Sequence, residues 1–291
     1  MTYIGEKGSS AVATRIMPQL EVPGASLYYE TLGTGPMLLC ISGANGSADI
    51  WKPMAKRLEK HFTIAMYDRR GYSRSLLSGA QDYSHRLETD ADDAERLIRH
   101  LSPEEPATVI GSSSGGLVSL ELLLRHPDAV RNLLCHEPPA MKLLPDCEEL
   151  MAAQHDIYQL YRKQGVAPAA ERFAQFIKAG SETPGLLRSF DPKSGSYNFA
   201  NSMYWFEREL PVYGEHDFHI ESFKQYQNKL LLLNSQDSDP EAMQYRSNVV
   251  LSEQLGLELH IMPGGHVGYA VHAPKFAQLL YDILKDKDSS Y

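Results

Sequence analysis

A serine flanked by glycines is the residue of this chain best placed to do chemistry. The spacing Gly111-x-Ser113-x-Gly115 matches the nucleophile elbow, a strained strand-to-helix turn that exposes a serine hydroxyl at the top of a sheet. Glycines two residues either side omit the Cβ atoms that would collide where the strand and helix backbones nearly touch. Ser113 is therefore the candidate nucleophile.

Three consecutive serines leave a second register open. With Ser114 as nucleophile the pattern becomes Ser112-x-Ser114-x-Gly116, which puts a side chain where the tighter turn requires none. A plain glycine-rich turn, or an anion cradle at a helix N-terminus, is the simplest non-catalytic interpretation. The context favours the elbow, because an apolar run over residues 107–110 precedes it and a leucine-rich helical pattern follows it.

A serine hydroxyl needs a base within hydrogen-bond reach. His266 follows a predicted strand and lies in a glycine-rich loop, at the carboxyl end of the strand where ligand chemistry gathers in a parallel sheet. His260 falls within that strand, His272 opens the last predicted helix, and His136 is expected to pack or hydrogen-bond locally at another strand end. We predict His266 as the general base.

A carboxylate must orient the histidine and stabilise its charged form. Two predicted strand ends offer one: Glu137 follows residues 130–136, and Asp237 and Asp239 follow residues 229–233. Neighbouring strands lie only about 5 Å apart, so either end can reach a histidine in the last loop. Position alone does not choose between these carboxylates.

The oxyanion formed by attack on a carbonyl needs preorganised N–H donors. One is the N–H of Ser114, which begins the helix and has no intrahelical acceptor. The second is expected from the loop after residues 37–41, at Gly43 or Ala44, which the sequence does not separate.

Apolar runs and helical patterns alternate along most of the chain, which predicts an α/β fold with right-handed crossovers and a mostly parallel sheet flanked by helices. Residues 140–221 break this rhythm with helical patterns alone, so we expect a helical lid inserted into a core formed by residues 1–139 and 222–291. Strands are predicted at residues 15–20, 25–31, 37–41, 63–67, 107–110, 130–136, 229–233 and 257–262, and helices at residues 50–60, 87–101, 117–126, 148–163, 168–179, 198–209, 241–255 and 273–285.

Composition narrows the classes of partner. The 291 residues carry a formal net charge of −9, which argues against nucleic acid or an anionic membrane surface as a partner. No apolar segment reaches membrane-spanning length, and residues 1–17 lack the continuous apolar stretch of a signal peptide, so a cytoplasmic location is expected. The three cysteines, Cys40, Cys135 and Cys147, are expected to be buried free thiols.

Two further polar clusters are expected to be structural. The loop at residues 68–73 holds the only short basic cluster. Glu215, His216, Asp217 and His219 have residue types that bind metals, but no second cluster completes a site. We expect no metal and no cofactor.

The ordered set of elbow, residues 68–73, helical insertion and late Gly265-His266 resembles the α/β-hydrolase superfamily over nearly the whole chain. In most of its members the acid follows the strand before the last, which would favour Asp237. More narrowly, Gly111-Ser112-Ser113-Ser114-Gly115, followed by His126-Pro127-Asp128 and Cys135-His136-Glu137, resembles the fungal zearalenone lactone hydrolases. Their acid is a glutamate at the earlier strand end, and Glu137 lies at the same separation, 24 residues past Ser113. This narrower resemblance also implies that Trp205 contacts substrate, and the resemblance to the superfamily implies that residues 68–73 brace the sheet.

We therefore expect a serine hydrolase that cleaves a carboxylic ester or lactone of a medium-sized, mostly apolar substrate. Ser113 would attack, His266 would transfer the proton and Glu137 would orient His266, in a monomer or homodimer. Related dehalogenases and epoxide hydrolases carry aspartate at the elbow, which Ser113 disfavours. A carbon–carbon bond hydrolase, a perhydrolase or a ligand-binding receptor on the same fold remains an alternative.

Overall fold

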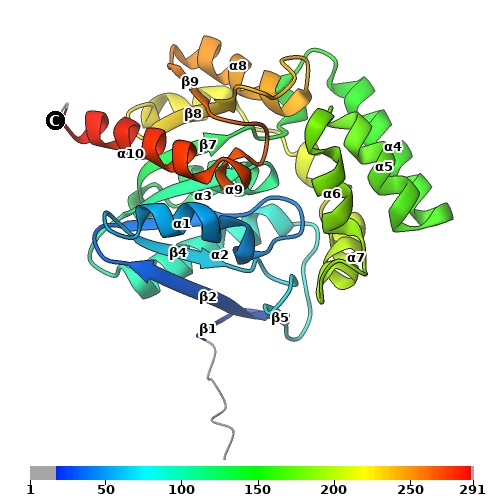
Figure 1. The fold of residues 1–291 in the computed structure, drawn as a ribbon, viewed down its shortest axis with the longest axis horizontal. Helices are drawn as coiled ribbons and strands as arrows, with labels where there is room; N and C mark the ends of the chain where they lie inside the picture. Colours follow the sequence, from blue (N-terminus) through cyan, green and yellow to red (C-terminus); the bar gives the residue numbers. More distant parts are fainter. Residues whose placement is uncertain (1–17, 290–291) are drawn as a thin grey trace, which may run out of the picture.

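One nine-stranded sheet forms the centre of the computed structural model, which describes residues 18–289 (Figure 1). The strand order is β1-β2-β4-β3-β6-β7-β8-β9, and β5 pairs with β2. Every pair from β4 to β9 along this order is parallel, whereas β1 and β2 form an antiparallel hairpin that continues antiparallel onto β4. The strands are β1 (Gln19–Val22), β2 (Ala25–Gly33), β3 (Met37–Ile41), β4 (Thr63–Tyr67), β5 (Leu76–Leu77), β6 (Ala107–Ser112), β7 (Val130–His136), β8 (Leu230–Ser235) and β9 (Leu259–Met262).

Helices cover both faces of this sheet because its central strands are apolar on both faces. In β3, Leu38 and Cys40 pack toward α1 and α10, whereas Leu39 and Ile41 pack toward α2, α3 and α8. Among the described residues, no helix combines the length and hydropathy needed to cross a membrane. The helices of the sheet layers are α1 (Lys52–Leu58), α2 (Arg86–Leu101), α3 (Ser114–Arg125), α8 (Met243–Leu255), α9 (Gly268–Val271) and α10 (Ala273–Ser289).

A helical insertion stands apart from these layers and has an apolar cluster of its own (Figure 1). We call this segment the insertion and propose that it spans residues 140–221, the bounds predicted from the sequence. Its helices are α4 (Cys147–Gln164), α5 (Val166–Phe176), α6 (Thr183–Phe190) and α7 (Asn198–Arg208). The residues of the insertion form no strand, as predicted. The short α6 was not predicted, because Pro184 and Gly185 lie within its eight residues and weaken the helical pattern.

Two local predictions need correction or narrowing. The strand predicted at residues 15–20 begins at Gln19 in the structure, and residues 1–17 lie outside the described part of the chain. Cys40 and Cys135 are buried free thiols, but Cys147 is only partly buried because it opens α4 at the surface of the insertion.

Candidate active site

Ser113 stands at a strained corner between β6 and α3. Its backbone has φ 57° and ψ −129°, a conformation that residues other than glycine rarely adopt. The flanking glycines make this corner possible. A Cβ atom at Gly111 would lie 2.2 Å from the carbonyl oxygen of Gly115, and one at Gly115 would lie 2.3 Å from that of Ile41. The strained backbone conformation is that of Ser113, whereas Ser114 is the first residue of α3. The structure therefore places Ser113, and not Ser114, at the corner.

His266 and Glu137 meet beside this corner, although 129 residues separate them. The Nδ1 of His266 lies 2.5 Å from Oε2 of Glu137. The fully buried carboxylate also accepts the N–H of Ser235 at 2.8 Å and the hydroxyl of Ser238 at 3.1 Å. These bonds fix the carboxylate and thereby the orientation of the imidazole ring.

The electrostatics of the pair favour an ionised carboxylate. Burial raises the pKa of Glu137, but the hydrogen bond from His266, the two nearby imidazoles and the Ser235 N–H outweigh burial and bring that pKa to about 2. Burial lowers the pKa of His266, whereas the bond to Glu137 and the charges of Glu137 and Glu182 raise it above its ordinary value. A negative carboxylate beside a more basic imidazole is the arrangement that stabilises an imidazolium.

A second histidine supports this pair from behind. His136 is fully buried at the end of β7, and its two ring nitrogens lie 2.9 Å from the Ser112 hydroxyl and 2.8 Å from the Ser235 hydroxyl. Burial lowers the pKa of His136 to about 4. Its neutral ring stacks against that of His266 with centroids 6.0 Å apart, so it packs the histidine without competing for its proton. The predicted local role of His136 agrees with these contacts.

The carboxylates of Asp237 and Asp239, after β8, do not contact His266. The side chain of Asp237 is exposed after β8, and the carboxylate of Asp239 pairs with Lys178 at 3.6 Å. Of the three carboxylates left open by the sequence, the structure brings only Glu137 to His266.

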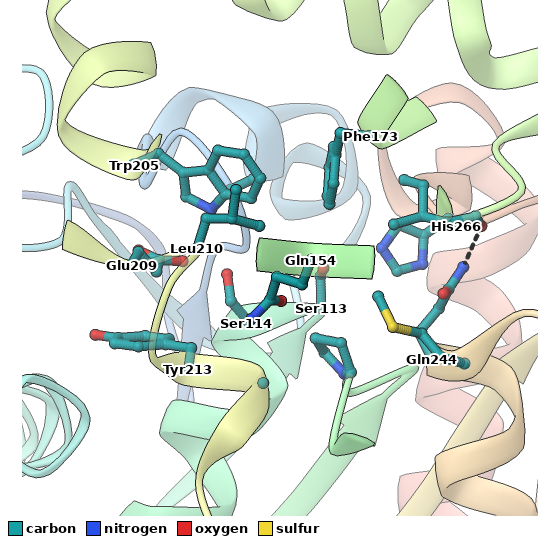
Figure 2. A pocket seen from close by; sticks show the side chains of 15 residues that line it. Ser113, Ser114, Gln154, Phe173, Trp205, Glu209, Leu210, Tyr213, Gln244 and His266 are labelled. Carbon is teal, nitrogen blue, oxygen red and sulfur yellow. Dashed lines mark hydrogen bonds between the residues drawn. The ribbon is translucent and has the colours of Figure 1, made fainter. Parts of the chain in front are cut away.

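Ser113 and His266 line one cavity (Figure 2). Within residues 18–289, the Ser113 hydroxyl forms no hydrogen bond to the ring. Catalytic hydrogen bonds are often long or poorly aligned without substrate and tighten when it binds.

The loop after β3, where the second oxyanion donor is expected, lies against Ser113. A Cβ atom at Gly43 would lie 2.8 Å from that of Ser113, so this loop touches the serine. The carbonyl oxygen of Gly43 accepts from Nη2 of Arg69 at 2.8 Å and from the N–H of Gly46 at 3.0 Å. In a trans peptide the N–H points opposite to the carbonyl, so these bonds turn the N–H of Ala44 away from Arg69. Since Ala44 lines the cavity, this orientation favours Ala44 over Gly43 as the donor.

The basic loop therefore does more than brace the sheet. Arg69 is fully buried and also pairs with Asp90 at 3.0 Å and with Glu209 of the insertion at 2.9 Å. The hydroxyl of Tyr72 donates to the same Glu209. No motif indicates that Arg69 reaches the Gly43 carbonyl, because that contact depends on how two loops pack.

Apolar side chains of both the insertion and the core wall the cavity beside Ser113. Trp205, predicted to contact substrate, lines it and packs edge-on against Phe173 with ring centroids 4.7 Å apart. The cavity volume is about 40 Å³. Its apolar wall consists of Ala44, Pro139, Phe173, Ile177, Trp205, Leu210 and Met243.

No set of three or more histidine, cysteine, aspartate or glutamate side chains in the described part of the chain is arranged to hold a metal ion. Of the cluster at residues 215–219, His216 turns to Glu121 at 3.3 Å and packs against Phe218. This cluster is accounted for by local packing.

The family of this chain follows from its similarity to known proteins. The α/β hydrolase fold family matches residues 36–273 of this chain. The chain belongs to the α/β-hydrolase family. An uncharacterized hydrolase, YraK of Bacillus subtilis (strain 168), is 32% identical over 271 residues, 91% of this chain and 95% of that protein.

Solved structures share the fold of this α/β-hydrolase. A thermophilic esterase from Thermogutta terrifontis has a TM-score of 0.70 and 18% identity, covering 93% of this chain and 99% of the other. An enol-lactonase from Burkholderia xenovorans LB400 has a TM-score of 0.68 and 17% identity, covering 92% and 100%. At this identity the likeness is one of architecture.

Glu182 is a further residue beside His266 that the sequence did not predict. Glu182 lies between α5 and α6 of the insertion, where its Oε1 accepts the N–H of Val267 at 3.1 Å, next to His266. Its carboxylate also packs against Gly265: a Cβ atom at Gly265 would lie 2.7 Å from the carboxylate and would displace it. No motif marks Glu182, since its role depends on the insertion folding over the histidine loop.

Glu182→Gln should shift the acid limb of the pH profile of kcat/KM to lower pH. The substitution keeps an acceptor for the Val267 N–H but removes a negative charge that raises the pKa of His266. A base acts when it is deprotonated, so a lower pKa preserves activity further into acid. We expect kcat at pH 8 to stay within about threefold, since the hydrogen bond to Glu137 remains. Glu171→Gln, an exposed change on α5, is the control. A limb that does not move would show that the Glu182 charge does not act on His266.

Proposed function

We propose that this α/β-hydrolase is a serine hydrolase that cleaves a carboxylic ester or lactone through an acyl-enzyme. The observation that carries the proposal is the 2.5 Å contact of Glu137 with His266 beside a cavity shared with the strained Ser113. The resemblance to lactone hydrolases with a glutamate at this strand end supports the same assignment.

In the proposed mechanism, the Ser113 hydroxyl attacks the carbonyl carbon while His266 takes its proton through Nε2. Glu137 holds the ring through Nδ1 and stabilises the imidazolium. The N–H groups of Ala44 and Ser114 receive the oxyanion. The imidazolium then protonates the leaving alcohol, and a water molecule, deprotonated by His266, releases the acid and restores the Ser113 hydroxyl.

The dimensions of the cavity favour a short acyl group. A volume of about 40 Å³ accommodates a few water molecules, which is less than a medium-sized substrate needs. We therefore propose that the acyl part enters between Ser113 and Trp205. A larger alcohol part would remain outside unless the insertion moves.

The proposal is tested by assaying p-nitrophenyl esters from acetate to octanoate together with small and macrocyclic lactones, and by trapping the intermediate. We expect turnover that favours the shorter acyl groups, and a mass increase equal to the acyl group on the peptide containing Ser113 after rapid acid quench. Ligand binding without turnover and without an adduct would instead support a receptor.

A further inference from the structure

Two glutamine side chains turn toward the cavity beside Ser113 although the surroundings are mostly apolar. Gln154 from α4 and Gln244 from α8 are each only 4% exposed. Figure 2 shows Gln154 reaching toward Ser113 and Ser114, and Gln244 lying on the side of His266. Both side chains line the cavity.

These amides have hydrogen-bonding groups without protein partners. The Nε2 of Gln154 is buried and unpaired. Gln244 donates its Nε2 to the carbonyl oxygen of Ile177 at 2.8 Å, which leaves its buried Oε1 without a donor. An unsatisfied buried polar atom costs about 1 to 3 kcal/mol, so two at one cavity call for an explanation.

The other polar groups of the cavity wall are already used within the protein. Glu209 accepts from Arg69 and Tyr72, and the Tyr213 hydroxyl donates to Asp90 at 2.6 Å. The two glutamines are therefore the side chains that remain available to a bound molecule, apart from the Ser114 hydroxyl and the Ser113–His266 pair.

We infer that Gln154 and Gln244 bind a polar group on the acyl side of the substrate. This group accepts a hydrogen bond from Nε2 of Gln154 and donates one to Oε1 of Gln244. A neutral amide or hydroxyl has both capacities. The inference rests on the proposed function and narrows it to esters or lactones whose acyl chain carries an amide or hydroxyl near the scissile carbonyl. No charged group is indicated, because no free cation or carboxylate among the described residues lines this cavity.

The test compares p-nitrophenyl esters matched in acyl size. N-formylglycinate is paired with pentanoate, and 3-hydroxybutanoate with 3-methylbutanoate, with rates corrected for uncatalysed hydrolysis. We expect kcat/KM at least about tenfold higher for one polar ester than for its apolar partner, since an apolar chain leaves the buried amides unpaired. The pair that shows the preference distinguishes amide from hydroxyl.

Gln154→Met and Gln244→Met keep the length of each side chain and remove its hydrogen bonds. Each should lower the polar-to-apolar ratio about tenfold by slowing the polar ester, with hydrolysis of the apolar ester kept. Gln164→Met on α4 and Gln254→Met on α8, both at exposed positions, are the matched controls. Gln154→Met is expected to keep its stability, because a buried amide with an unpaired donor is replaced by an apolar group. Gln244→Met also removes the hydrogen bond to the carbonyl oxygen of Ile177, so a lower unfolding midpoint is expected for this variant.

Failure of this inference is distinguishable from failure of the proposed function. Equal rates within each pair, unchanged in both variants, would overturn the inference while ester hydrolysis stands, and would leave water as the partner of the two glutamines. Should no ester be hydrolysed, the same four compounds are titrated calorimetrically into Ser113→Ala. Tighter binding of a polar compound, lost in the Gln154→Met background, would then support the subsite, and equal binding would overturn it.

Discussion

Replacing Ser113 with alanine should lower kcat for every hydrolysed ester by about 10⁴-fold or more, because the attacking oxygen is removed and no acyl-enzyme can form. The fold should be kept, since the hydroxyl of Ser113 makes no hydrogen bond in the described part of the chain. Loss of the acyl adduct in the quenched protein, together with a wild-type unfolding midpoint, would establish the chemical role.

Ser114→Ala is the comparison that tests the register of the three serines. The change keeps the main-chain N–H proposed for the oxyanion and removes a hydroxyl that has no partner. We expect kcat to fall by less than about tenfold, since each good oxyanion donor contributes about 3 to 4 kcal/mol and none is removed. Abolished turnover in Ser114→Ala with retained turnover in Ser113→Ala would assign the nucleophile to Ser114.

Glu137→Gln should lower kcat by about 10³ to 10⁴-fold. The amide is similar in shape but cannot stabilise an imidazolium, and it can hold His266 in the wrong tautomer. The charge of Glu137 and its hydrogen bond raise the pKa of His266, so the residual activity should extend to lower pH than wild-type activity. The pH profile of kcat/KM, measured from pH 4 to 9, checks both effects.

Asp237→Asn and Asp239→Asn are the matched controls for that substitution. Asp237 is exposed, and Asp239 is engaged with Lys178 at the surface, so each variant should stay within about twofold of wild-type kcat. Wild-type activity in Glu137→Gln, with collapse in Asp237→Asn, would move the acid to the later strand end and overturn the proposed triad.

Local patterns in the sequence predicted the sheet, the elbow and the histidine loop well. Buried strands such as residues 37–41 are uniformly apolar, and the glycines at 111 and 115 are required by backbone contacts that any elbow makes. The choice between Glu137 and Asp237 depended instead on which strand end faces the last loop. That is a three-dimensional property, and the residues alone left it open.

The contributions of the insertion were the hardest to predict. Glu182 and Glu209 act across loops that are distant in the chain, and neither belongs to a motif. Gln154 had a usable signal, because it shares one helical face with Ile157 and Tyr161 and an amide on a buried face calls for a partner. The sequence suggested an apolar pocket, whereas the structure adds hydrogen-bonding groups to it.

The buried ion pair of Arg69 and Glu209 also restricts which part of the insertion can move away from the cavity. Pulling the end of α7 away from the sheet would separate Glu209 from the buried Arg69, which would keep Asp90 as its partner, and breaking a buried ion pair costs about 3 to 5 kcal/mol. The end of α7 is therefore expected to stay in place when substrate enters.

On the opposite side, hydrogen bonds of Ile177 and Glu182 and the exposed ion pair of Lys178 with Asp239 hold the insertion to the core. These contacts cost less to break than a buried ion pair, so a bulky molecule would enter there, and that movement would also displace the loop that carries His266.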